Sequence, residues 1–161
     1  MDQQLNVVEL CPVAPGKVAK YFTQILVSDT FTIPEQKPDK EQIINVSRDI
    51  TLADVQTISV DLPDPGVDGN KIFAAGNVYL GVQYSADRPS QTVHYVRFQL
   101  PFQAVIVGDC GNLIPSTDTI FGPNSYVVHV CVEKMEYQQI DKRIIFFELL
   151  LLVWVEEVVA P

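Results

Sequence analysis

Two histidines and three cysteines are the side chains of this sequence best suited to metal binding or nucleophilic catalysis. His129 and Cys131 stand two residues apart in a strand-like run, so they project from one face, and this spacing permits metal ligation or a Cys–His pair. Such a site needs further ligands or a residue that orients the base, and the sequence indicates none. His94 shares the parity of Val96 and Phe98, which favours a packed or rim imidazole. We therefore expect no enzymatic activity and no catalytic, cofactor or metal site.

The carboxylates of the chain stand mostly in predicted loops, at Asp61, Asp64, Asp68, Asp109 and Asp118. The acidic run 61–68 is not followed by the closing glutamate of an EF-hand loop. Solvated turn carboxylates are the simplest interpretation, with weak calcium binding as an alternative. A dispersed acid pair of the glycosidase type is a further alternative, but no pair stands out. P-loop, GxGxxG and GxSxG motifs are absent from the sequence.

The three cysteines, Cys11, Cys110 and Cys131, match no zinc or redox spacing. One interpretation is that all three are small, partly buried thiols. A second interpretation starts from their odd number and from the position of Cys11 in a probable N-terminal arm. It predicts that one cysteine pairs between subunits. A metal site is the third alternative.

Aromatic residues gather on two neighbouring strand candidates, at Tyr79, Tyr84, Tyr95 and Phe98. By strand alternation, Tyr79 and Tyr95 share the outward face of the predicted hairpin. An exposed pair of this kind could form a platform for carbohydrate. Cross-strand packing explains the same residues equally well.

The charge of the chain argues against nucleic acid as a partner. Its 161 residues include 11 Lys and Arg against 20 Asp and Glu, for a formal net charge of −9 and a sequence pI of about 4.5. The basic residues are scattered, whereas nucleic-acid binding needs them clustered. An anionic membrane surface is disfavoured for the same reason.

The N-terminal sequence Met1-Asp2-Gln3-Gln4 lacks the basic and apolar regions of a secretory signal. The most apolar stretch, 144–155, is interrupted by Glu148 and is shorter than the roughly 20 residues of a spanning helix. We therefore expect a soluble chain that is made in the cytoplasm.

Short strands separated by turn residues dominate the pattern, and no amphipathic helix of ten or more residues is visible. A short helical turn is expected to open at Pro38, and 63–70 is the clearest loop. The runs 76–84 and 92–100 are expected to form a hairpin. The expected strands are 18–29, 43–52, 55–62, 76–84, 92–100, 103–107, 126–132, 135–140 and 143–157. These features predict an all-β fold, an antiparallel β-sandwich of jelly-roll type.

The last predicted strand, 143–157, is apolar on both faces. A strand of an antiparallel sheet with one solvated face should alternate instead. Either this strand is central and covered on both sides, or another subunit buries its second face.

Residues 1–17 are predicted to form an N-terminal arm ahead of a single domain at 18–161, because Pro12, Pro15 and Gly16 interrupt regular structure. The preceding run 5–10 is β-prone and contains Leu5, Val7, Val8 and Leu10. It could fray, lie on its own sheet, or be exchanged onto the sheet of a neighbouring subunit. Leu5, Val7, Val8, Leu10, Cys11, Cys110 and Cys131 are thus the candidate assembly residues.

Two stretches are more specific than composition. The first reads IPEQKPDKEQII over 33–44, and the second combines GNVYLGVQY over 76–84 with HYVRFQLPF over 94–102. Together they resemble the SPOCS domain family, named after the endospore coat morphogenesis proteins SipL and SpoVID of clostridia and bacilli. The resemblance covers roughly 18–158. Lys40 stands where the family usually has an apolar residue, and no LysM module follows. The resemblance implies no catalytic residues.

The residues and the resemblance together lead to one expectation for function. The chain should be a structural protein of the endospore surface, in coat, exosporium or appendage, that is made in the mother cell and deposited on the spore. It should assemble with itself, and with other spore-surface proteins, through sandwich contacts and the N-terminal arm. A carbohydrate- or cell-wall-binding module is the alternative.

Overall fold

The computed structural model describes residues 4–8, 19–62 and 67–161. Over these ranges the chain consists of strands and two short 3-10 helices, which confirms the predicted all-β class. The strands are β1 (Gln4–Val8), β2 (Ala19–Thr32), β3 (Lys40–Leu62), β4 (Val67–Ala86), β5 (Val93–Ile106), β6 (Ser125–Gln139) and β7 (Ile144–Val158). The 3-10 helices are η1 (Asp109–Gly111) and η2 (Thr119–Phe121).

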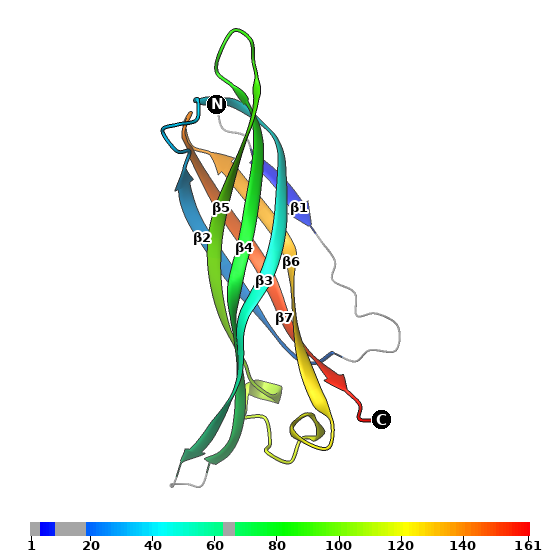
Figure 1. Ribbon diagram of the computed structural model, residues 1–161. Helices are drawn as coiled ribbons and strands as arrows, with labels where there is room; N and C mark the ends of the chain where they lie inside the picture. The colour runs from blue at the N-terminus through cyan, green and yellow to red at the C-terminus, as the bar shows by residue number, and fades with distance from the viewer. Residues whose placement is uncertain (1–3, 9–18, 63–66) are drawn as a thin grey trace.

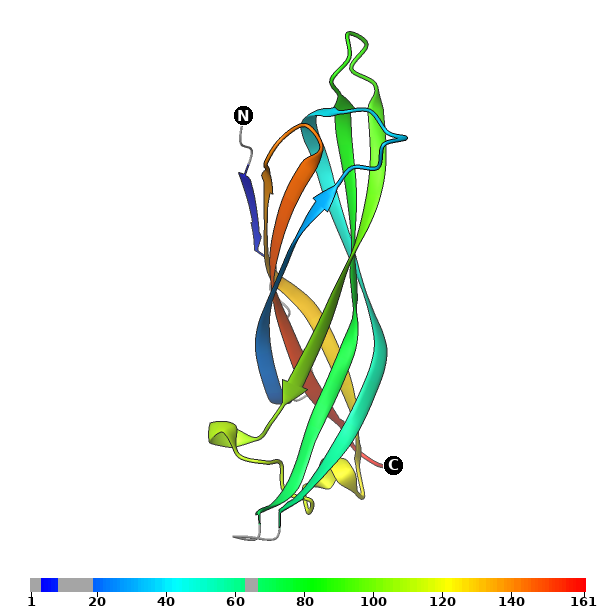
Figure 2. The same cartoon turned by 90° about the vertical axis from the view of Figure 1, so that its left-hand side faces the viewer.

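The strands form two antiparallel sheets, which face each other as the two layers of an elongated molecule (Figure 1; Figure 2). Sheet A has the order β1-β6-β7-β2, and sheet B is the meander β3-β4-β5. Apolar side chains of both sheets meet in the interior, where the rings of Phe31 and Phe98 stack at 4.8 Å between centroids. The arrangement is compatible with the predicted jelly-roll-like sandwich.

β7 lies between β6 and β2, so the last strand is central in its sheet, but within the described residues it is not covered on both sides as the first alternative required. Its inward side chains are fully buried because they face sheet B, whereas Phe146, Leu150 and Leu152 on the outer face are only half-buried. Within the described residues, no third layer covers this outer face. The inward set consists of Ile145, Phe147, Leu149, Leu151, Val153 and Val155.

Two predicted breaks between strands are wrong, because each is a bulge inside one continuous strand. The register of β3 against β4 shifts between Leu52 and Asp54, and β3 continues on both sides of the shift. β6 shifts in the same way between Val132 and Lys134. A bulge takes up one extra residue without ending the strand, so a polar interruption in the sequence does not mark a turn.

The predicted hairpin is confirmed as β4 and β5, which pair from Ile72 opposite Ile106 to Ser85 opposite Val93. Pro101 does not end the second strand, because β5 continues in the same sheet to Ile106. β5 is an edge strand of sheet B, where a proline can leave the ladder intact on its unpaired side. Of the loop expected over 63–70, residues 67–70 belong to β4, and residues 63–66 lie outside the described residues.

The helical turn expected at Pro38 is not formed. The turn lies earlier, over residues 35–37, where the Lys37 N–H donates to the carbonyl of Pro34 at 2.9 Å. Pro38 itself leads directly into β3. The extended conformation that proline favours suits the start of a strand as well as the start of a helix.

β1 adds to the edge of sheet A beside β6, with residues 4–8 opposite residues 138–134 (Figure 1). Of the three alternatives for this segment, the structure shows pairing on the chain's own sheet. Leu10 and Cys11, and with them the predicted end of the arm, lie outside the described residues.

Candidate functional site

His129 and Cys131, the two residues considered for a metal site or a Cys–His pair, lie on the outer face of sheet A, where both make structural contacts. His129 stacks on Trp154 at 4.3 Å between ring centroids, and its Nε2 lies 2.7 Å from Oε1 of the buried Glu156. Cys131 takes part in a disulfide, so it offers neither a thiolate ligand nor a nucleophile. Among the described residues, no three His, Cys, Asp or Glu side chains are grouped so that they could hold a metal ion.

His94 occupies the partly buried position that its parity predicts. Its ring stacks on Tyr84 at 5.8 Å, and its Nε2 lies 3.0 Å from the hydroxyl of Thr92. These contacts fix the imidazole against β4 and the start of β5. The ring is thus held by one aromatic contact and one hydrogen bond.

The candidate assembly residues are spread over sheet A and the loop that follows sheet B. Leu5, Val7 and Val8 belong to β1, opposite residues 137, 135 and 134 of β6. Cys110 is a free, exposed thiol in η1 with a φ of 56°. It lies apart from Cys131, which stands opposite Leu152 in the middle of sheet A. The structure therefore does not bring Cys110 and Cys131 into one site, and Cys11 lies outside the described residues.

An apolar strip crosses the outer face of sheet A, and sequence reasoning missed half of it. Phe22 and Leu26 of the edge strand β2 are 64% and 68% exposed. The register places Phe22 beside Trp154 and Leu26 beside Leu150, so the strip continues onto the half-buried face of β7. We call these four residues with Leu152 the sheet A strip. The spacing of Phe22, Gln24 and Leu26 on one strand face was the available signal.

Charged side chains border this strip on the side of β6. Leu26 and Leu150 line a shallow hollow of about 220 Å³ together with Lys134, Glu136 and Glu148. Lys134 and Glu136 are two residues apart on β6 and therefore share a face, and Lys134 Nζ lies 2.8 Å from Glu136 Oε1. The strip also contains one polar link, because Gln24 Nε2 donates to Glu133 Oε1 at 2.7 Å, and a mixture of apolar and polar groups of this kind is usual in a protein–protein contact.

The segment 33–44, which carries part of the family resemblance, has a structural role. Arg143 Nη1 donates to Asp39 Oδ1 at 2.6 Å, and Nη2 donates to the carbonyl oxygens of Ile33, Pro34 and Lys37 at 3.0, 2.6 and 3.1 Å. One guanidinium thus fastens the β2–β3 connection to the start of β7. The motif fixes a crossover between the two sheets and presents no site.

Lys40 completes this junction from inside. Its side chain is fully buried, and its Nζ donates to the carbonyl oxygens of Asp141 and Ile144. Burial lowers the pKa of the Lys40 ammonium to about 8, although the carboxylates of Asp141 and Asp39 act in the opposite direction. A polar group at this position in place of an apolar one is satisfied by backbone acceptors of the β6–β7 turn.

We expect the buried ammonium of Lys40 to make stability depend on pH. The unfolded chain releases this proton near pH 10.4, and the folded chain releases it near pH 8. Between these values the unfolded state binds more protons, so the free energy of unfolding should rise with pH, by about 2 kcal/mol from pH 8 to about 10. Urea unfolding of the native protein and of Lys40→Met at a series of pH values measures this slope.

The Lys40→Met protein should lack this rise, whereas Lys37→Met, at a half-exposed position of the same connection, should keep it. Equal slopes in all three proteins would contradict the burial of a titrating Lys40. The measurement stops near pH 10, because tyrosine ionisation adds a second effect above that pH. Burial raises the pKa of Tyr84 and Tyr137 in the folded state. These tyrosines therefore ionise first in the unfolded chain, which lowers the free energy of unfolding.

At the opposite end of the molecule, Asp118 is a structural carboxylate and not the solvated one predicted. It accepts hydrogen bonds from the Tyr21 hydroxyl and from the Ile120 N–H, and Lys20 Nζ lies 3.2 Å away. Burial alone would raise the pKa of Asp118, but these donors hold it below its usual value. Burial and the bond to Asp118 raise the pKa of Tyr21 to about 12. The cluster ties the loop before β6 to β2.

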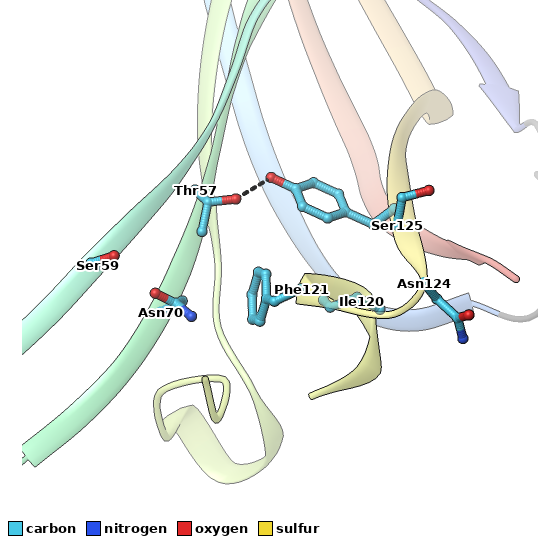
Figure 3. Close-up of a pocket in the computed structure, with 8 residues that line it drawn as sticks. Thr57, Ser59, Asn70, Ile120, Phe121, Asn124 and Ser125 are labelled. Atoms are coloured by element: carbon cyan, nitrogen blue, oxygen red, sulfur yellow. Dashed lines mark hydrogen bonds between the residues drawn. The ribbon is translucent and has the colours of Figure 1, made fainter. Parts of the chain in front are cut away.

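A wide hollow of about 490 Å³ lies beside this loop, between the β3–β4 hairpin and η2 (Figure 3). The Tyr126 hydroxyl reaches across it to Thr57 Oγ1 at 2.5 Å. Its other walls are Ser59, Asn70, Ile120, Phe121, Asn124 and Ser125. The lining offers hydroxyl and amide groups, but it contains no carboxylate, imidazole, thiol or cation that could activate them.

The outer face of sheet B brings Tyr79 and Tyr95 to one hollow, as their parity predicts. Tyr95 is 48% exposed, whereas the Arg97 guanidinium lies over the Tyr79 ring, 4.1 Å from its centroid. The two rings are therefore not equivalent, because Arg97 covers one face of Tyr79. The hollow also includes Ser47 and Asp49 of β3, which the sequence did not place there.

No helix in the part of the chain that the structure describes is long and apolar enough to cross a membrane. Comparison with known proteins found no matching family model, no matching curated protein and no matching solved structure.

Proposed function

We propose that this protein is a structural subunit that assembles with copies of itself through sheet A. The observation that carries the proposal is the sheet A strip, in which two large apolar side chains on an edge strand stand 64% and 68% exposed beside the half-buried outer face of β7. Sheet A has no covering layer among the described residues. A second copy would supply the missing contact.

The strip is self-complementary. Phe22 and Leu26 stand symmetrically about Gln24 on β2, a strand with a hydrogen-bonded neighbour on one side only. If two copies of β2 pair antiparallel about Gln24, Phe22 of each copy lies opposite Leu26 of the other. This is an isologous contact, the commonest kind between identical subunits. Each such cross-strand pair of Phe22 with Leu26 would contribute about 0.2–1 kcal/mol.

An isologous contact alone closes a dimer, so a layer or filament needs a second contact. β1 lies at the other edge of sheet A, where residues 4–8 pair with only part of β6. Exchange of this five-residue strand between copies would preserve the same register and would extend the assembly. The proposal therefore uses the two edges of one sheet, β2 for pairing and β1 for linkage.

The place of this assembly follows from the resemblance of segments 33–44 and 76–102 to the SPOCS domain family. That resemblance supports deposition on the endospore surface, in coat, exosporium or appendage. A net charge of −9 supports solubility of the subunit before it assembles. The function proposed is structural, since the described residues form a packed sandwich that carries the exposed sheet A strip.

Charge reversal on β2 tests the proposal directly. The double variant Phe22→Glu with Leu26→Glu should remain folded but should lose the β2 contact and show a lower mass than the native protein by size exclusion with light scattering, because carboxylates would oppose each other across the contact. The matched control is Val93→Glu with Val105→Glu, at exposed positions on the edge strand β5 of the other sheet. The control should keep the native mass.

Deletion of residues 1–16 in the same experiment separates the two contacts. The truncated protein should stop at the dimer, whereas the native protein should form larger species in negative-stain micrographs. A native protein that is monomeric at all concentrations, or a β2 variant with the native mass, would overturn the proposal.

A further inference from the structure

The outer face of sheet B holds a hollow of about 400 Å³ that the assembly through sheet A leaves free. Three neighbouring strands contribute to it: β3 with Ser47, Arg48 and Asp49, β4 with Tyr79 and Gly81, and β5 with Tyr95 and Arg97. We call it the sheet B hollow. Its residues combine an exposed aromatic residue with one carboxylate, two guanidinium groups and hydroxyl groups.

Gly81 forms the floor of the sheet B hollow and allows Tyr95 to lie across it. A Cβ at position 81 would be 2.4 Å from the Tyr95 hydroxyl and 2.5 Å from Ser47 Oγ. A side chain there would therefore push the phenol away from the sheet. With glycine, the phenol end of Tyr95 rests on β4, and the ring remains 48% exposed to solvent.

Arg97 is a positioned hydrogen-bond donor at the same place. Its guanidinium lies 4.1 Å from the centroid of the Tyr79 ring, a cation–π contact that holds the group close to the sheet surface. Among the described residues, no carboxylate lies within ion-pair distance of Arg97. Arg97 is exposed, lines the hollow and stands opposite Gly81 in the β4–β5 register.

Asp49 supplies an acceptor on the other side. It is exposed and stands opposite Tyr79 in the β3–β4 register. Its negative charge lies among the guanidinium groups of Arg97 and of the half-buried Arg48, so the lining carries charges of both signs. A carboxylate that accepts and a guanidinium that donates suit a neutral ligand with several hydroxyl groups.

We propose that the sheet B hollow binds one pyranose unit of a glycan chain. The apolar C–H face of the sugar would lie on Tyr95, while hydroxyl groups at the ring edge would donate to Asp49 and accept from Arg97. Sites for small ligands combine such an apolar surface with a few placed polar groups. The chain of the glycan would leave the hollow along the open face of the sheet.

Saturation-transfer NMR with chitotetraose and with cellotetraose tests this inference, and it works for an assembled protein as well as for a monomer. At least one tetrasaccharide should receive magnetisation at its ring protons. Tyr95→Ala should weaken binding about tenfold, which corresponds to about 1.4 kcal/mol. Tyr126→Ala, at the tyrosine of the hollow in Figure 3, should bind like the native protein.

Gly81→Ala is the second variant, and it keeps every polar group. The added methyl displaces the end of a flexible side chain and no backbone atom, so the fold should persist while Tyr95 leaves its place. This variant should lose binding to a similar extent. The glutamate variant of β2 should bind normally, so failure of assembly and failure of sugar binding are distinguishable.

Three results would overturn the inference. The first is absence of saturation transfer to both tetrasaccharides. The second is native binding by Tyr95→Ala or by Gly81→Ala. The third is displacement of the sugar by inorganic phosphate at equal concentration, since that result would identify an anion site at Arg97.

Discussion

Replacement of Gly76 by alanine should destabilise the fold by about 3 kcal/mol or more, the largest effect that we expect from adding a single methyl group. A Cβ at this position would be 2.0 Å from the backbone oxygen of Thr51 and 3.0 Å from Cζ of Phe102. Thr51 belongs to β3, and the next residue, Leu52, pairs with Gly76 at the start of the bulge. The strand cannot retreat there without breaking its ladder.

Urea unfolding followed by circular dichroism measures the effect of Gly76→Ala as a lower midpoint. Gly111→Ala is the matched control, because a Cβ at Gly111 meets no atom within 4 Å although its φ is +74°. That control should lose only about 1 kcal/mol, the cost of a left-handed conformation for a residue with a side chain. Equal losses in the two proteins would contradict the close approach of β3 and β4 at this bulge.

Arg143→Ala should be the second largest change, with a loss of about 3 kcal/mol. The guanidinium makes one bond to Asp39 and three to backbone carbonyls of the β2–β3 connection. Bonds to a charged donor contribute about 1.5–3 kcal/mol each when buried. Arg143 is partly exposed, so solvent replaces some of them and the total stays below their sum.

Arg143→Lys separates charge from geometry. An ammonium can reach Asp39 but cannot span three carbonyls, so most of the loss should remain. Arg88→Ala, at an exposed position of the β4–β5 turn, should change stability by less than about 0.5 kcal/mol. If Arg143→Lys were as stable as the native protein, the hydrogen bonds to the carbonyl groups would contribute nothing to stability, and only the ion pair with Asp39 would contribute.

The pattern of alternation predicted the strands and their faces well. The β4–β5 hairpin follows from two alternating runs around a turn, and the shared face of Tyr79 and Tyr95 follows from the same parity. Both features depend on neighbours in sequence. A strand period of two residues and a short connection are visible without any knowledge of the fold.

The prediction failed where a strand pairs with a distant partner. The polar residues near Ala53 and Glu133 look like turns, but the neighbouring strand absorbs each as a bulge. Asp49 could not be placed beside Arg97, because β3 reaches β5 only through the register of β4. Arg143 and Asp39 stand 104 residues apart, and no local pattern joins them.

The sequence by itself determined that this protein is all-β and that its last strand has two apolar faces. It did so because side-chain alternation and turn residues are local properties of the chain. Only the tertiary structure decided which apolar face remained uncovered, since that depends on the order of strands in sheet A and on the absence of a third layer over the described residues. The same packing placed Phe22 and Leu26 beside β7, and it gathered Asp49, Tyr95 and Arg97 on the opposite sheet.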